Sequence, residues 1–326
     1  MEIKNIIILG ARGNVGTALI AELRKIPDQF TITAVSRTSS TYTAPPGSNI
    51  AVKAVDYASL ESLTDAFAGQ DAVVNCITGG ATQYEPSVRI IDAAVAAGVK
   101  FFFANSFAGN VGSEQFKRLP EAAAGAKVRV REYLTQLVGE GKIAWTALNG
   151  GPFFDMWLMK GPAGFDVKNK QARIYGEGTN PLWWTPLPTI AVAAANILRN
   201  PSPALNRGIY ICPFAPGALT QNVLLAALET VLDAKFTVTH VDVAAINRAA
   251  KAALARGDVK TAMRGFAISN QFYEGDCGNN LEGMTENAMC GVKEIGVEEA
   301  IREAVGRYGV EGGVVESMFR VEASEI

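Results

Sequence analysis

The first predicted strand and the turn that follows it read NIIILGARGNVG, residues 5–16. Asn5–Leu9 is apolar without alternation, which is typical of a strand buried on both faces of a parallel sheet. Gly10 permits a tight turn, Gly13 lets backbone N–H groups approach a pyrophosphate, and Gly16 lets a helix pack close to the strand. The spacing is G-x-x-G-x-x-G rather than the commoner G-x-G-x-x-G. Its strand–turn–helix context nevertheless favours a dinucleotide site over a glycine-rich structural turn.

The first half of the chain continues this alternation of buried strands and helices. Strands separated by helices imply right-handed crossovers and a parallel sheet. We therefore expect an α/β fold with a Rossmann-type doubly wound parallel sheet, and a dinucleotide-binding domain over residues 1–150. The expected strands are Asn5–Leu9, Thr31–Ser36, Ile50–Val55, Ala72–Cys76, Lys100–Ala104 and Ile143–Leu148, and the expected helices are Val15–Lys25, Ala58–Phe67, Pro86–Ala97 and Ala126–Val138.

The pattern changes after Gly150, where Gly, Pro and aromatic residues become frequent. We expect a smaller C-terminal α/β region for substrate binding over residues 151–326, with some elements returning to the main sheet. Tyr175–Pro188 is turn-rich, and the polar, Asn-rich segment Gly275–Met289 is predicted to be a long loop or a lid. Helices are expected over Ile190–Leu198, Gln221–Leu232, Val243–Ala255 and Val297–Tyr308, and strands over Gly208–Cys212 and Phe236–Val241.

The composition excludes several classes of function. With 326 residues, 48% of them hydrophobic, and a net charge of −2, the chain can bury a large core and is a poor candidate for nucleic-acid binding. The only histidine, His240, rules out His-rich metal sites, and we interpret it as structural rather than substrate-binding. The four cysteines form no C-x-x-C pair, so we expect no metal and a reducing compartment. No targeting or membrane-spanning stretch is visible, so a cytoplasmic monomer or homodimer is expected.

The residues after the second predicted strand indicate which dinucleotide is bound. An NAD enzyme usually has Asp or Glu there to bind the ribose 2′-hydroxyl, whereas this chain has Ser36–Thr38. Arg37 and Arg12 could instead pair with a 2′-phosphate, although Arg37 could also be an ordinary surface residue. The missing acidic residue favours NADP(H). Asp56, after the third strand, is placed to face the adenine.

These motifs resemble the NmrA-like and isoflavone reductase-like family of atypical short-chain reductases, in its fungal secondary-metabolism branch. The resemblance covers roughly residues 3–199 and rests on residues 10–16, 36–37, 101–110, 127–131, 149–155 and 175–178. None of the eight tyrosines is followed four residues later by lysine. The Tyr-x-x-x-Lys acid of typical short-chain dehydrogenases is therefore missing.

The resemblance implies a catalytic lysine. The reductase branch of the family begins a helix with K-x-x-x-R, which Lys127 and Arg131 match. The lysine of this pattern positions the nicotinamide ribose or relays a proton, and burial beside a cofactor can lower its pKa. The alternative is a solvated helix lysine. Plant relatives carry Ser-Glu-Phe where this chain has Asn105–Phe107, so an acidic residue is missing beside the substrate.

Together, the motifs and the resemblance predict an NADPH-dependent reductase. It would transfer hydride to an activated C=C or C=O of an aromatic, phenylpropanoid- or polyketide-like small molecule. The alternatives are a non-catalytic NADP(H)-sensing regulator of the NmrA type and a redox-neutral cyclase or dehydratase. Lys127 is the predicted catalytic residue, and the predicted substrate contacts are Phe107, Phe154, Trp157 and Trp183. The predicted cofactor-binding residues are Gly10, Arg12, Gly13, Asn14, Val15, Gly16, Ser36, Arg37, Thr38, Asp56, Tyr57, Thr78, Gly79, Asn105, Ser106, Lys127, Gly151, Pro152 and Phe153.

Overall fold

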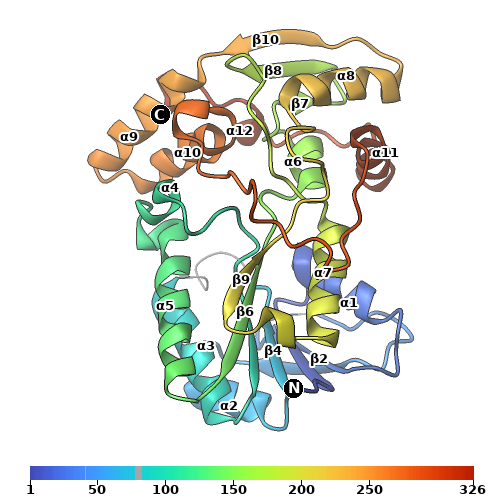
Figure 1. Cartoon of the computed structure of the whole chain (residues 1–326), viewed down its shortest axis with the longest axis vertical. Coiled ribbons are helices and arrows are strands. Elements are labelled where there is room, and N and C mark those ends of the chain that lie inside the picture. Colours follow the sequence, from blue (N-terminus) through green and yellow to red (C-terminus); the bar gives the residue numbers. More distant parts are fainter. Residues whose placement is uncertain (41, 78–82) are drawn as a thin grey trace.

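A seven-stranded parallel sheet forms the centre of the computed structural model, which describes residues 1–40, 42–77 and 83–326 (Figure 1). The strand order is β3-β2-β1-β4-β5-β6-β9, so the chain starts at the middle of the sheet and winds outward in both directions. The predicted Rossmann-type fold is confirmed. The strands are β1 Asn5–Leu9, β2 Thr31–Arg37, β3 Ala51–Val55, β4 Ala72–Asn75, β5 Phe101–Ala104, β6 Ala144–Asn149 and β9 Arg207–Tyr210.

Helices cover both faces of this sheet. Ile6 and Ile8 of β1 pack on the face covered by α1 and α7, while Ile7 and Leu9 pack on the face covered by α2, α3 and α5. All four side chains are fully buried, which is why β1 is apolar without alternation. The covering helices are α1 Asn14–Leu23, α2 Leu60–Phe67, α3 Tyr84–Ala96, α5 Ala126–Gly139 and α7 Leu187–Arg199.

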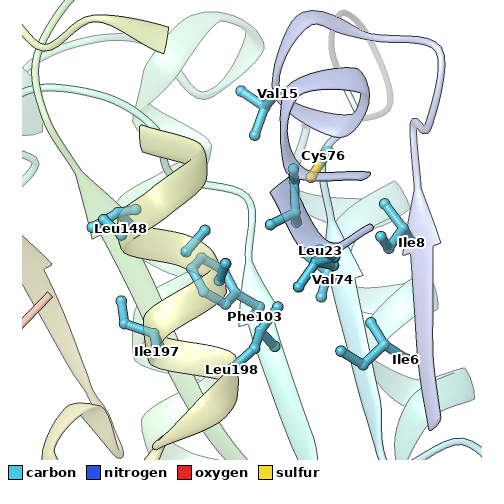
Figure 2. Packing of buried hydrophobic residues seen from close by; sticks show 14 of the residues in the cluster. Ile6, Ile8, Val15, Leu23, Val74, Cys76, Phe103, Leu148, Ile197 and Leu198 are labelled. Carbon is cyan, nitrogen blue, oxygen red and sulfur yellow. The ribbon is translucent and has the colours of Figure 1, made fainter. Parts of the chain in front are cut away.

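Figure 2 shows the cluster on the α1 and α7 face from close by. Side chains from six strands, β1, β2, β4, β5, β6 and β9, meet those of the two helices in this cluster, and α1 and α7 also contact each other. Because α7 lies beyond residue 150, the second half of the chain completes the core of the first. The labelled members are Ile6, Ile8, Val15, Leu23, Val74, Cys76, Phe103, Leu148, Ile197 and Leu198.

A smaller sheet lies at the other end of the molecule from the N-terminus (Figure 1). In it, β8 pairs in parallel with β10 and antiparallel with the two-residue β7. The strands are β7 Phe165–Asp166, β8 Gln171–Tyr175 and β10 Thr237–Val241. The remaining helices are α4 Glu114–Lys117, α6 Phe154–Lys160, α8 Gln221–Leu232, α9 Val243–Ala255, α10 Val259–Phe272, α11 Val297–Tyr308 and α12 Glu316–Phe319, with one π-helical turn at Glu121–Gly125. Within the described residues, no helix is long and apolar enough to cross a lipid bilayer.

The helix α10 is the largest element that the sequence analysis missed. Its buried face mixes Ala262, Gly265 and Ser269 with larger residues, so the apolar periodicity is weak. A Cβ at Gly265 would lie 2.8 Å from the Cβ of Ala250, because α10 packs tightly against α9. Close helix packing, rather than a hydrophobic stripe, therefore places α10.

The segment Gly275–Met289 is a loop for most of its length, and its contacts hold it along its course. Asn279 is 1% exposed and donates to the Trp183 carbonyl oxygen at 3.1 Å. Asn287 Nδ2 donates to the Cys212 carbonyl oxygen at 2.7 Å. Of the two expectations, loop or lid, these contacts favour a fixed loop.

Candidate active site

The glycine turn after β1 has the geometry that the motif predicts. Gly10 has φ +74°, and a Cβ there would lie 2.5 Å from the Cys76 carbonyl oxygen. A Cβ at Gly16 would lie 2.3 Å from the Gly10 carbonyl oxygen. Both positions therefore require glycine. Gly13 precedes the first residue of α1, so the N-terminus of that helix opens at the carboxyl end of β1.

A cavity of about 360 Å³ adjoins this turn, and we call it the glycine-loop cavity. Six of the predicted cofactor-binding residues line it: Gly10, Arg12, Gly13, Ser36, Arg37 and Tyr57. Ser40 and Tyr42 line it as well and were not predicted, although the run of hydroxyl residues after Arg37 could have indicated them. Ala11, Val35, Cys76 and Ile77 complete the lining, which contains no acidic residue.

The guanidinium groups of Arg12 and Arg37 are free to meet an anion at this cavity. Both residues are exposed, and within the described part of the chain neither forms an ion pair. Burial raises the pKa of the Tyr57 phenol, and the positive charge of Arg37 opposes that rise. The lining thus carries positive charge without a carboxylate to neutralise it.

Other predicted cofactor residues lie at the margin of this cavity or away from it. Asn14 is exposed and its Nδ2 donates to the Met156 sulfur of α6 at 3.2 Å, while Val15 is buried in α1. Thr38 is exposed and does not line the cavity. Asp56 accepts from the Ala58 backbone N–H at 2.9 Å and does not line it either. Thr78 and Gly79 lie outside the described residues.

Lys127 lies in the first turn of α5 and is held by a single residue. Its Nζ donates to the side-chain Oδ1 of Asn105 at 2.8 Å and to the Asn105 carbonyl oxygen at 3.0 Å. Asn105 in turn donates through Nδ2 to the carbonyl oxygen of Ile77. Burial lowers the pKa of Lys127 to about 7, and the positive charge of Arg131 contributes to the lowering. Because both acceptors are neutral, neither offsets the cost of burying the ammonium group.

Arg131, the second residue of the K-x-x-x-R pattern, belongs to a buried polar network. Its Nη2 donates to Asn149 Oδ1 at 2.7 Å and to Ser106 Oγ at 2.9 Å. The Ser106 hydroxyl also donates to Asn149 Oδ1, at 2.6 Å. This network joins α5 to the ends of β5 and β6. Ser106, which was predicted to contact the cofactor, thus has its hydroxyl bonded within the protein.

A second cavity, of about 220 Å³, opens between the loops after β5 and β6 and the helices α4 and α10, and we call it the α10 cavity. Phe107, Gly151 and Pro152 are the predicted site residues that line it. The other lining residues were not predicted, and five of them belong to α10, which was itself missed. They are Ala108, Gly109, Gln115, Phe116, Arg118, Leu119, Ala124, Met263, Phe266, Ala267, Asn270 and Gln271.

The backbone at two of these residues is specialised. Phe107 has φ +39°, in the left-handed region that bulky residues rarely adopt, and its ring stacks on Phe103 at 5.9 Å. Gly151 has φ +68°, and a Cβ there would lie 1.8 Å from the Trp183 carbonyl oxygen. Strain at Phe107 is a mark of a functional position.

The remaining residues predicted to contact substrate or cofactor lie outside the α10 cavity. Phe154 is fully buried and packs on Phe214, with ring centroids 5.1 Å apart, and the rings of Trp157 and Trp184 lie 5.4 Å apart. Phe154 and Trp157 do not line the α10 cavity. Trp183 lines a separate cavity near Cys277, and Phe153 forms a β-bridge with Thr185. His240 is exposed, with Nδ1 3.2 Å from the Gly176 carbonyl oxygen.

Lys127 and Asn105 line neither cavity, but residues next to them line both. Ile77, which accepts from Asn105, lines the glycine-loop cavity. Phe107, two residues after Asn105, and Ala124, about one helical turn before Lys127, line the α10 cavity. The Lys127–Asn105 pair is therefore connected through its neighbours to the walls of both cavities.

Comparisons with known proteins show which family the chain resembles. A family of proteins described as NAD(P)H-binding matches residues 10–170, from the first glycine of the turn to the end of the loop before β8. The oxidoreductase aprR of Aspergillus flavus is 32% identical over 259 residues, which cover 79% of this chain and 83% of aprR. The similarity therefore extends well beyond the glycine turn.

Two solved structures share the fold over almost their whole length. The isoflavone reductase structure has a TM-score of 0.70 at 20% identity and covers 92% of this chain and 99% of its own. The NADPH-dependent quinone oxidoreductase QOR2 of Escherichia coli, complexed with NADPH, has a TM-score of 0.69 at 21% identity and covers 91% and 99%. At these identities, the comparison shows a common fold.

Proposed function

Because the chain belongs to the NmrA-like and isoflavone reductase-like family of NAD(P)H-binding oxidoreductases, we propose that it is an NADPH-dependent reductase of aromatic small molecules. The bond reduced would be an activated C=C or C=O. The observation that carries this proposal is the bond of Lys127 to Asn105. The partner of Asn105, Ile77, lines a cavity suited to a dinucleotide, and its neighbour Phe107 lines a second, mostly apolar cavity.

The glycine-loop cavity fits NADP(H). The cradle around Gly10 and Gly16 has no room for a Cβ, and the N-terminus of α1 can meet the pyrophosphate there. Arg12 and Arg37 supply two guanidinium groups for a 2′-phosphate. An NAD site would instead hold a carboxylate for the 2′-hydroxyl, and none lines this cavity.

The α10 cavity is the proposed substrate site. Residues 151–326, which we assign to substrate binding, supply Gly151, Pro152 and the α10 part of its lining, and residues 107–124 of the first half supply the rest. Its lining includes the rings of Phe107, Phe116 and Phe266 together with the Met263 thioether. Such walls suit a flat aromatic molecule. Phe107 and Pro152 line this cavity and lie in the loops that follow β5 and β6. The reacting atom would therefore lie at the carboxyl ends of these two strands.

When bound, NADPH supplies the hydride. The matching proton would come from Lys127, whose ammonium form is plentiful below pH 7 and scarce well above it, because its pKa is about 7. Asn105 holds the ammonium group through two acceptors and so fixes the direction in which the proton is offered. An unshifted lysine, with a pKa near 10.4, would give up its proton much less readily at neutral pH.

Consumption of NADPH with a panel of aromatic enones, ketones and quinones tests this function. We expect turnover by the wild-type protein and a loss of about 10²-fold or more in Lys127→Met. Lys142→Met, which changes an exposed lysine beyond the C-terminal end of α5, should keep full turnover. Binding of NADPH without turnover of any compound would contradict the reductase and favour a regulator. Product formation without NADPH consumption would favour a redox-neutral enzyme.

A further inference from the structure

Gln271, in the last turn of α10, is a buried glutamine whose amide orientation is fixed. Gln271 is 6% exposed. Its Oε1 accepts from the Trp184 indole Nε1 at 3.0 Å and from Asn279 Nδ2 at 2.8 Å. An indole N–H can only donate, so the atom facing Trp184 must be the oxygen. The Nε2 end of Gln271 is therefore turned away from both partners.

That Nε2 group makes no hydrogen bond to any described residue, and Gln271 lines the α10 cavity. Another buried glutamine, Gln221, shows the usual arrangement. Its Oε1 accepts from the Tyr175 backbone N–H at 2.8 Å, and its Nε2 donates to the carbonyl oxygens of Ala163 and Arg173 at 2.8 and 3.0 Å. Buried amide groups are normally bonded at both ends. Gln271 thus holds a donor that the protein itself does not use.

The other polar groups of the α10 cavity decide what could accept from this donor. Arg118 forms two bonds with Asp276, at 3.0 and 2.7 Å, but Lys251 Nζ lies 3.1 Å from the same carboxylate, so two cations share this one acidic side chain. Arg118 Nε is buried and has no hydrogen-bond partner among the described residues. Asn270 Oδ1 accepts from the Gly278 backbone N–H at 2.9 Å, so its amide Nδ2 is a further donor. The cavity therefore offers N–H donors among apolar walls, and an oxygen acceptor matches it.

We propose that Gln271 is a specificity-determining residue, whose Nε2 donates a hydrogen bond to a carbonyl oxygen of an aromatic substrate in the α10 cavity. This inference rests on the proposed function, because it takes the α10 cavity as the substrate site. A carbonyl oxygen is an acceptor for the N–H groups of an amide. Trp184 and Asn279 act through Gln271, as positioning residues that aim its donor.

Binding of a ketone and of the matching hydrocarbon to the NADP⁺-loaded protein tests the inference. The probes are 1-tetralone and tetralin, which differ only at the carbonyl group, and NADP⁺ in place of NADPH prevents reduction. We expect the wild-type protein to bind 1-tetralone about tenfold more tightly than tetralin, as one net hydrogen bond of ordinary strength allows. Isothermal titration calorimetry measures both dissociation constants.

Two variants remove the donor in different ways. Gln271→Glu keeps an acceptor for Trp184 and Asn279 but loses the N–H donor when ionised, and Gln271→Met removes the donor whatever the pH. In both, the preference for 1-tetralone should fall to about onefold, while NADP⁺ affinity stays unchanged. Gln136→Glu, an exposed residue of α5, makes the same chemical change as Gln271→Glu and should keep the preference.

The outcomes separate this inference from the proposed function. A wild-type protein that binds both probes equally, or neither of them, overturns the role of Gln271, as does a tenfold preference that survives in both variants. Failure of the wild-type protein to bind NADP⁺ in a separate titration would contradict the proposed reductase instead. Thermal melting of each variant shows whether a lost preference reflects unfolding rather than the missing donor.

Discussion

Lys127 Nζ lies 2.8 Å from Asn105 Oδ1 and 3.0 Å from the Asn105 carbonyl oxygen, so one uncharged residue provides both acceptors for a buried lysine. A carboxylate at the same place would stabilise the ammonium form. A neutral amide holds the group in position while leaving its pKa low, at about 7. Asn105 thus fixes the position of the ammonium group, while burial and the charge of Arg131 lower its pKa.

The first prediction concerns the pH dependence of turnover. Lys127 must be protonated to donate, so the rate of reduction should fall as pH rises through about 7. Asn105→Asp places a negative charge beside the ammonium group and should move that fall upward by about 1–3 pH units. The pH profile of kcat in the two proteins measures the shift. An identical profile in both would show that Lys127 does not supply the proton.

A second prediction follows from the burial of Lys127. The pKa of Lys127 is about 7 in the folded protein, against 10.5 for an ordinary lysine. Between these two pH values the unfolded chain binds more protons than the folded protein, so the free energy of unfolding rises with pH across that window. Lys127→Met should therefore raise Tm at pH 7, by about 2 °C or more. The advantage should shrink by pH 9. Thermal unfolding at both pH values measures it, and a pH-independent difference would contradict the lowered pKa.

The preference for the cofactor gives a third prediction. Arg37 lines the glycine-loop cavity without an ionic partner among the described residues, so Arg37→Ala should weaken NADPH binding about tenfold to a hundredfold. Binding of NADH, which lacks the 2′-phosphate, should change little. Arg302→Ala, on the distant helix α11, should affect neither cofactor. Equal losses for NADPH and NADH would show that Arg37 does not read the phosphate.

The glycine turn gives a fourth prediction. Gly16→Ala would push a Cβ to 2.3 Å from the Gly10 carbonyl oxygen, so the turn must shift and NADPH affinity should fall at least about tenfold. Gly139→Ala is a matched control, because a Cβ there meets nothing within 4 Å. It lies at the end of α5 and should leave binding unchanged, with stability equal or higher by up to about 1 kcal/mol. Calorimetric titration and thermal melting compare the two.

Much of the fold could be predicted because strong local patterns specify it. The helices Gln221–Leu232, Val243–Ala255 and Val297–Tyr308 were predicted with the bounds that they have, and most strand boundaries differ by only one or two residues. In the structure, Thr220 and Asp242 each accept a hydrogen bond from the first turn of the helix that follows. The helix α10, whose buried face mixes small and polar residues with large apolar ones, was not predicted.

Some residues of the candidate site could likewise be predicted from the sequence, and others could not. The residues of the glycine-loop cavity come from short segments at the ends of β1, β2, β3 and β4, and the sequence analysis located six of them. The aromatic residues after Gly150 were predicted to contact the substrate, yet Phe154 and Trp157 pack into the second core. An aromatic side chain in a sequence does not reveal whether it will face a core or a cavity.

By itself, the sequence determined the parallel sheet, the glycine turn and the candidate lysine, because each depends on residues close together in the chain. Only the tertiary structure decided where the second cavity lies and which donors face it. The α10 cavity joins residues near 107, 118, 151 and 270, and the aim of Gln271 depends on Trp184 and Asn279. Those contacts depend on the packing of α10 against α9 and on the hydrogen bond from Asn279 to the Trp183 carbonyl oxygen. Such long-range packing and hydrogen bonding have no local sequence signature, so the sequence alone could not predict them.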